Sequence, residues 1–165
     1  MAAMSAPWLE SKTPVGPPTA ANPTVRQLLY AAIVTGTWSG LLCLVIYLIA
    51  SLFSVDFVLM APSGDAQVRF PWIFFLLVPL SFAVAGALLS SLVRGRQHAG
   101  RLVFWIGTLI ALGTTVVPIT QPSDVPWSTR IILVVMHVIT WLLVVPQIAR
   151  IVGDSEPGAH VDRVE

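Results

Sequence analysis

The sequence predicts an all-α fold, a bundle of four transmembrane helices, from its composition and from the distribution of its apolar residues. Of the 165 residues, 56% are hydrophobic and 10% are charged, and the mean hydropathy is +0.83. Soluble domains average roughly 25% charged residues, so this composition is typical of a membrane protein. The apolar residues form long runs at about 28–53, 70–93, 102–119 and 131–148. Each run is close to or longer than the roughly 20 residues that a helix needs to cross a bilayer.

The segments at the two ends of the chain are polar. Residues 1–26 are rich in proline and alanine, and each proline removes a hydrogen-bond donor and restricts its neighbour, so we expect a flexible tail. Residues 151–165 are acidic, and we expect a disordered tail there too. The transmembrane domain is therefore expected at residues 27–150, with no separate soluble domain.

The first run, 28–53, carries Gly36 and Gly40 on one helical face, together with Cys43 and Tyr47. Small residues four apart let helix backbones approach closely in lipid, where the hydrophobic effect does not hold helices together. We therefore expect this face to pack against another helix, either within the chain or in a second copy. The single cysteine excludes an intramolecular disulfide, and its place in an apolar run is typical of a buried thiol.

The second run, 70–93, follows an apolar segment, Val55–Met60, that is too short to cross a bilayer. We expect this segment to lie at the interface or to cap the bundle. Trp72 and its aromatic neighbours at the start of the run are typical of an interfacial belt. Ala83 and Gly86 offer another surface for close helix packing.

The loop after the second run predicts the topology. It contains Arg94, Arg96 and Arg101 and no acidic residue. Because short loops rich in Arg and Lys stay on the cytoplasmic side, we expect this loop and both termini to be cytoplasmic, in a multi-pass protein of the cell membrane. The alternative interpretation of these arginines is a binding site for anionic headgroups or for a partner.

The third run, 102–119, carries Gly107 and Ala111 at the same four-residue spacing as the small residues of the first run. We expect this pair to pack against another helix. Thr114 and Thr115 lie near the end of the run that is expected to face outward.

The fourth run, 131–148, carries His137, a histidine well inside an apolar run. A common stripe on this helix contains Arg130, His137, Thr140 and Gln147, with Trp141 beside it. Polar and ionisable groups are costly in hydrocarbon, so we expect the stripe to face the bundle interior or a wet cleft. Ser128 or Thr129 is expected to cap the helix, which should end near Pro146.

His137 is predicted to lie roughly 9 Å below the outer end of its helix, at 1.5 Å per residue. Residues of the first and third runs reach a similar depth. We hypothesise a hydrogen-bonded cluster there, and the candidate ligand-binding residues are His137, Tyr47, Thr114, Thr115, Thr140 and Trp141. The alternative is a neutral, structural histidine that one hydroxyl or carbonyl satisfies.

The fourth run also carries a resemblance to known sequences. It contains Met136-His137, then Val144-Val145-Pro146, and then Arg150, and it closes a chain of four short spans with a basic central loop. This pattern resembles a family of small four-helix membrane proteins of unknown function that is frequent in actinobacteria. The resemblance covers roughly residues 26–151, and it implies the fold but no activity.

Motifs for catalysis and metal binding are missing from the sequence, which contains no HExxH, CxxC or GxSxG pattern. The apolar runs hold one histidine and one cysteine, whereas a metal usually needs three or four protein ligands. We therefore expect no metal, no cofactor and no catalytic residue. The net charge of +1 does not favour nucleic acid as a partner.

Three functions are consistent with these observations. The favoured one is a non-enzymatic accessory or structural subunit that packs against a larger membrane complex or against itself. The alternatives are a binding module for an apolar ligand, a lipid, a quinone or haem, in a cleft around His137, and a small membrane enzyme that uses His137 as acid or base. The lipid bilayer is the expected partner in every case.

Overall fold

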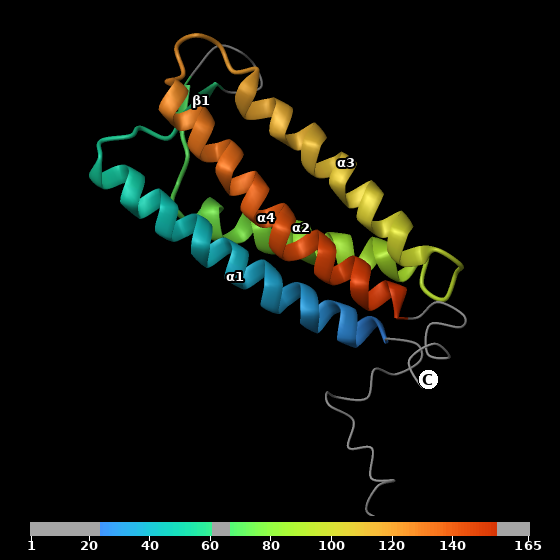
Figure 1. Ribbon diagram of the computed structural model, residues 1–165. Coiled ribbons are helices and arrows are strands. Elements are labelled where there is room, and N and C mark those ends of the chain that lie inside the picture. The colour runs from blue at the N-terminus through green and yellow to red at the C-terminus, as the bar shows by residue number, and fades with distance from the viewer. Residues whose placement is uncertain (1–23, 61–66, 155–165) are drawn as a thin grey trace, which may run out of the picture.

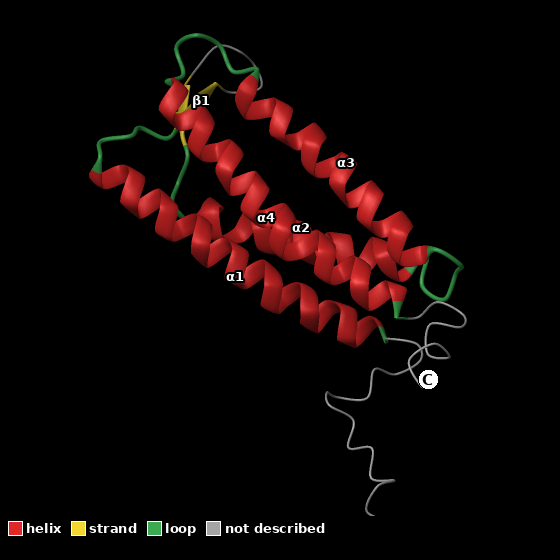
Figure 2. Cartoon of the chain, viewed as in Figure 1, coloured by secondary structure: helices red, strands yellow, loops and turns green. Residues whose placement is uncertain are grey.

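The computed structural model describes residues 24–60 and 67–154 (Figure 1). Within them the chain forms four helices, α1 (Val25–Leu52), α2 (Ile73–Ser91), α3 (Ala99–Ile119) and α4 (Trp127–Gly153), and two short strands, β1 (Val58–Met60) and β2 (Gln67–Arg69) (Figure 2). All four helices are long and apolar enough to cross a membrane. The predicted all-α fold with four such helices is therefore confirmed. Most of the two predicted tails lies outside the described residues.

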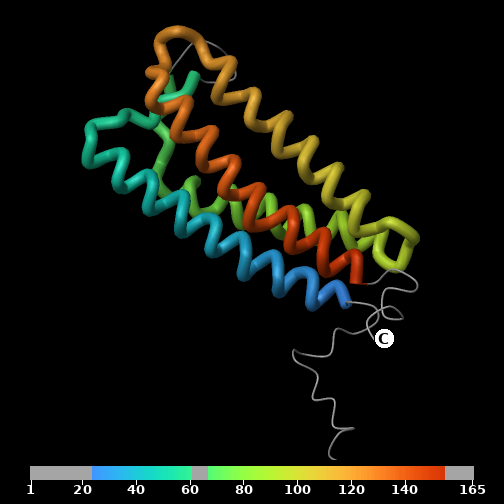
Figure 3. The backbone as a smooth tube through the Cα atoms, viewed as in Figure 1, coloured from blue at the N-terminus to red at the C-terminus, as the bar shows by residue number. Residues whose placement is uncertain are grey.

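The helices are arranged around α4. Helix α1 packs against α2 and α4, and α3 packs against α4, whereas α2 and α3 make little direct contact. The start of α1, the α2–α3 loop and the end of α4 lie at one end of the bundle, which we call the terminal end (Figure 3). The β1–β2 hairpin and the α3–α4 loop lie at the other end, which we call the hairpin end (Figure 1).

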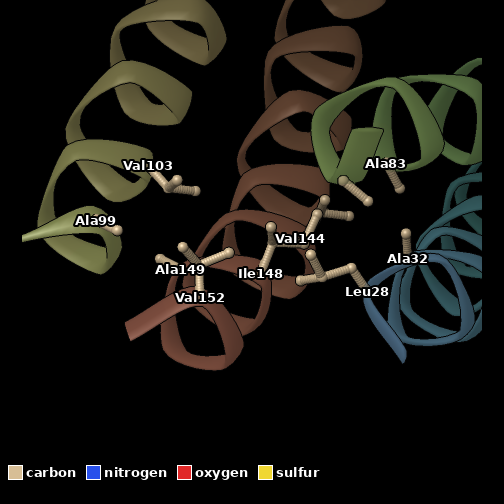
Figure 4. Close-up of a cluster of buried hydrophobic side chains, with 10 residues drawn as sticks. Leu28, Ala32, Ala83, Ala99, Val103, Val144, Ile148, Ala149 and Val152 are labelled. Carbon is tan, nitrogen blue, oxygen red and sulfur yellow. The ribbon is translucent and has the colours of Figure 1, made fainter. Parts of the chain in front are cut away.

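The core near the terminal end is built from small and branched side chains. Ala32, Ala83 and Ala87 are completely buried between α1, α2 and α4. Figure 4 shows Val144 of α4 on the side of Ala83, and Ala149 and Val152 of α4 on the side of Ala99 and Val103 of α3, so that α4 joins the two parts of this cluster. Alanines keep the helices close, which maximises van der Waals contact where lipid removes the hydrophobic driving force.

The ends of α1 and α4 differ from the predicted spans. Helix α1 begins at Val25 because Thr24 and Gln27 form a capping box, in which each side chain accepts a hydrogen bond from the other's backbone N–H. Helix α4 begins at Trp127 without a side-chain cap, so the predicted cap by Ser128 or Thr129 was wrong. It also continues through Pro146 to Gly153 instead of ending near the proline.

Residues 55–60 and 67–69 lie at the hairpin end and are called the lid below. They include two strands that the sequence did not predict. Strands β1 and β2 pair antiparallel, with Leu59 opposite Val68. The Met60 N–H donates to Gln121 Oε1 at 3.0 Å, and the buried Thr129 hydroxyl donates to the Asp56 carbonyl at 2.8 Å. The Thr129 side chain therefore ties the start of α4 to the lid, which explains why it does not cap its own helix.

Arg130 is buried at the hairpin end and holds the α3–α4 loop. Its guanidinium donates to the carbonyls of Val125 at 3.0 Å, of Ile119 at 3.5 Å and of Pro122. It also lies 4.7 Å from the centre of the Trp127 ring, a favourable cation–π geometry. The cation is thus satisfied by carbonyl dipoles of the loop that it closes.

Candidate functional site

A long apolar groove runs between α2 and α3. Its volume is about 560 Å³, and α4, which contacts both flanking helices, lies beneath it. On its rim, Phe82 of α2 and Ile106 of α3 are about half exposed. The groove, called the α2–α3 groove below, exists because both helices pack on other partners and leave their facing sides apart.

Among the described residues, the wall of the α2–α3 groove contains no acidic or basic side chain apart from a histidine. The residues with polar atoms in this wall are Cys43, Ser90, Thr114, His137, Thr140 and Trp141. Pockets of roughly 300–1,000 Å³ with mostly apolar walls and a few placed polar groups are typical ligand sites in proteins. The α2–α3 groove has both properties.

His137 projects from α4 into the wall of this groove and is partly buried. Its Nδ1 lies 2.8 Å from the carbonyl oxygen of Leu133, one turn earlier in the same helix. A carbonyl oxygen only accepts hydrogen bonds, so Nδ1 carries the proton, and in the neutral ring Nε2 keeps a lone pair. Among the described residues, no group bonds to Nε2.

Thr140 joins α4 to α1 through hydrogen bonds of its hydroxyl. Its hydroxyl accepts a hydrogen bond from the completely buried Ser39 at 2.9 Å and donates to the Met136 carbonyl at 2.9 Å. The Cys43 thiol lies 3.9 Å from the same carbonyl. Ser39 was missed at the sequence level, although its spacing from Cys43 places it on the face of α1 that was predicted to pack.

Trp141 joins α4 to α3. Its Nε1–H donates to the Thr108 hydroxyl at 3.0 Å, and that hydroxyl donates to the Phe104 carbonyl at 2.8 Å. Thr108 was also missed, because a lone threonine in an apolar run most often bonds only to its own helix. The bond holds Trp141, which lines the α2–α3 groove one turn after His137.

Within the described part of the chain, His137 makes no hydrogen bond to the other candidate residues, so the hypothesised cluster is not seen there. Tyr47 stacks instead on Phe75 at 4.6 Å and packs against Phe57 at 4.9 Å. The Thr114 and Thr115 hydroxyls both donate to the Ala111 carbonyl, at 3.0 and 2.7 Å. A threonine on a helix satisfies its hydroxyl most easily on the preceding turn. Of these residues, Thr114 still shares the groove wall with His137.

The small residues of α1 lie at the contact with α2. A Cβ atom on Gly36 would come within 2.8 Å of the Ala83 Cβ, and one on Gly40 within 2.6 Å of the Leu76 carbonyl oxygen. Both distances are shorter than real Cβ contacts, so only glycine allows this approach. The first predicted seam is therefore occupied within the chain.

The small residues of the other helices divide between two roles. A Cβ on Gly107 would come within 2.8 Å of a Val145 methyl group, so this glycine lets α3 approach α4. Ala111 and Gly86 line the α2–α3 groove, and a Cβ on Gly86 would meet Ile148 only at an ordinary 3.8 Å. A Cβ atom therefore fits at Gly86 but not at Gly107 without a shift of Val145.

A family of unknown function, DUF6069, matches residues 23–154 of the chain. The chain belongs to this family. The match covers all four helices and the hairpin between α1 and α2. No curated protein and no solved structure matches the chain. Family membership therefore assigns no activity.

The basic loop of this DUF6069 protein lies at the terminal end. Arg94 and Arg96 are in the turn that joins α2 to α3, and Arg101 is in the first turn of α3. Gly95 and His98 have positive φ angles of 76° and 62°, which reverse the chain tightly. Arg96 and Arg101 are exposed. The α2–α3 turn lies at the same end of the bundle as the start of α1 and the end of α4 (Figure 1).

The polar stripe of α4 is only partly internal. Arg130 is buried at the hairpin end, and His137 and Thr140 line the groove, but Gln147 is exposed. Gln147 lies in the last two turns of α4, near the terminal end. Within residues 24–60 and 67–154, no three His, Cys, Asp or Glu side chains lie close enough to hold a metal.

Proposed function

We propose that this protein is a non-enzymatic membrane protein that binds a neutral, lipid-like molecule in the α2–α3 groove. The observation that carries the proposal is the groove itself, whose volume of about 560 Å³ lies within the range of ligand sites. Its opening lies between two helices that each suit a membrane span, so an apolar molecule reaches it sideways from the bilayer.

The groove wall fits a flexible apolar chain. It combines large side chains such as Phe74 and Phe82 with small ones such as Ala85, which leaves an uneven, apolar surface. An empty groove would deprive its lining of van der Waals contacts on one side. A long hydrocarbon chain restores these contacts without placing a polar group in hydrocarbon.

An accessory subunit, the function that the sequence favoured, has less support. Small-residue seams are the surfaces by which membrane helices dock. Gly36, Gly40 and Gly107 are already covered by helices of the same chain. An enzymatic role for His137 also lacks support, because within the described residues the only group that its ring bonds to is a backbone carbonyl.

The direct test is to identify what the purified protein carries. The protein is purified in mild detergent from its native host, which the resemblance predicts to be an actinobacterium, and its extract is analysed by mass spectrometry. We expect about one neutral lipid-like molecule per chain. Stoichiometric protein partners without such a molecule would instead support the subunit function and overturn the proposal.

A matched pair of variants shows whether that molecule occupies the groove. Gly86→Leu fills the α2–α3 groove, because Gly86 lines it and has room for a side chain. Gly113→Leu adds the same atoms on α3 where nothing lies within 4 Å, outside the groove wall. We expect Gly86→Leu to lose most of the bound molecule and Gly113→Leu to keep it. Equal occupancy in both variants would show that the groove is not the site.

The proposal also includes an orientation, with the terminal end in the cytoplasm. It is supported by the exposed Arg96 and Arg101 and by the positive-inside rule. His137 then lies in the half of the bundle that faces away from the cytoplasm. A fluorescent protein fused to the C-terminus should fluoresce, and alkaline phosphatase fused there should be inactive; the reverse pattern would overturn the orientation.

A further inference from the structure

The polar groups of the α2–α3 groove define the ligand more closely than its apolar wall does. His137 is central because its two ring nitrogens have different roles. Nδ1 donates to the Leu133 carbonyl at 2.8 Å, so the neutral ring presents only the Nε2 lone pair to a ligand. An acceptor in apolar surroundings gains most from a ligand that donates a hydrogen bond.

The donors around His137 are already used within the protein. The Thr114 hydroxyl donates to Ala111 at 3.0 Å, and the Thr140 hydroxyl donates to Met136 at 2.9 Å. The Trp141 Nε1–H donates to Thr108 at 3.0 Å. Among the described residues near His137, the groove therefore offers acceptors and no free donor, which suits a ligand hydroxyl and does not suit a ligand carbonyl.

A charged ligand head is disfavoured as well. No lysine, arginine, aspartate or glutamate lines the groove within the described part of the chain. A carboxylate or phosphate would lose its hydration there without gaining an opposite charge. The same argument disfavours haem, whose two propionates would need cationic partners.

The length of the groove indicates where the apolar tail of the ligand lies. Leu133, one turn before His137, and Ile148 are the first and last residues of α4 in the groove wall. Ile148 lies eleven residues beyond His137, roughly 16 Å at 1.5 Å per residue. A head at His137 therefore has most of the groove for a tail that extends toward the terminal end.

We infer that the ligand of the α2–α3 groove is a neutral apolar alcohol or phenol whose hydroxyl donates a hydrogen bond to Nε2 of His137. The inference rests on the proposed function, because it names the chemical class of the molecule that the groove binds. A second polar side chain of the groove, Ser90, competes with His137 for the hydroxyl of the ligand. Ser90 is buried near the terminal end of the groove, and its hydroxyl has no hydrogen bond in the described residues.

The test compares probes that differ only in the head. The full-length protein in mild detergent is labelled with three photoreactive probes of the same long alkyl chain, which end in a primary alcohol, its methyl ether or a methyl ketone. Labelled peptides are located by mass spectrometry. We expect the alcohol to label peptides of the groove about threefold to tenfold more efficiently than the ether or the ketone, the gain that one net hydrogen bond gives.

Two variants locate the acceptor. In His137→Phe the preference for the alcohol should disappear while labelling by the ether persists. In Ser90→Ala, which removes the competing hydroxyl, the preference should remain. Thermal unfolding of both variants, followed by circular dichroism, checks that the helices are intact. A preference that survives in His137→Phe, or that is lost only in Ser90→Ala, would overturn the inference.

The remaining outcomes separate this inference from the proposed function. If all three probes label the groove equally in the unaltered protein, the groove binds apolar chains without selecting for a hydroxyl group. In that case only the inference fails. Preference for the ketone has the same meaning. If no probe labels the groove above the level seen in Gly86→Leu, the proposed function fails together with the inference.

Discussion

Gly40→Ala tests how closely α1 and α2 approach. A Cβ atom at this position would lie 2.6 Å from the Leu76 carbonyl oxygen and 3.1 Å from the Leu76 Cα. Both are backbone atoms, so the clash is relieved only if the two helices move apart. Overpacking of this kind costs roughly 1–3 kcal/mol. Alanine gains up to about 1 kcal/mol over glycine in a helix interior, which offsets part of that loss.

The control is the same substitution in open space. Gly113 lies inside α3 with nothing within 4 Å, so Gly113→Ala keeps the gain in helix propensity without a clash. We therefore expect the free energy of unfolding of Gly40→Ala to be lower than that of Gly113→Ala by about 1–3 kcal/mol. Unfolding by sodium dodecyl sulfate in mild detergent, followed by circular dichroism, measures this difference.

Two further glycines make the test a graded series. At Gly107 the added Cβ would meet Val145 methyl groups at 2.8 Å, which can shift more easily than backbone. At Gly86 the nearest atom is a methyl group of Ile148, at 3.8 Å. We expect stability to rise from Gly40→Ala through Gly107→Ala to Gly86→Ala. Equal stability of Gly40→Ala and Gly113→Ala would refute the close approach of α1 and α2 at Gly40.

Two other contacts give simple predictions. Trp141→Phe removes the hydrogen bond to Thr108 but keeps an aromatic ring. We therefore expect the free energy of unfolding to fall by about 0.5–1.5 kcal/mol in the same assay. No change would show that this bond does not hold α3 on α4. Arg130→Met leaves the carbonyls of Val125, Ile119 and Pro122 without their donor. We expect the free energy of unfolding to fall by about 2–4 kcal/mol and proteases to cleave the α3–α4 loop faster. An unchanged cleavage rate would contradict the role of Arg130 in holding that loop.

Part of the site could be predicted because the cost of a polar group in hydrocarbon is visible in the sequence. His137 and Thr140 stand out inside an apolar run, and both line the α2–α3 groove. Their partners could not be predicted in the same way. Thr140 bonds to Ser39 across the α1–α4 contact, and depth along the helices does not reveal which faces of two helices meet.

Tyr47 also shows that depth along a helix does not predict the partner of a side chain. Its predicted depth matches that of His137, but its ring packs on Phe57 of the lid and Phe75 of α2. The lid itself depends on pairing between two strands of three residues each, which is too short to give a periodic pattern. Pro146 likewise predicted a helix end, yet α4 continues to Gly153, where its last turns pack against α3 through Ala149 and Val152. Tertiary contacts thus overrode local signals at these positions.

The sequence by itself determined that four helices form and that all of them suit a bilayer. This requirement is one-dimensional, since crossing hydrocarbon needs only a sufficient number of consecutive apolar residues whose backbone groups bond within the helix. The tertiary structure alone decided that α3 packs on α4 and not on α2, because that choice depends on the fit of Gly107 against Val145 across the two helices. The α2–α3 groove, and with it the candidate site at His137, follows from that one packing choice.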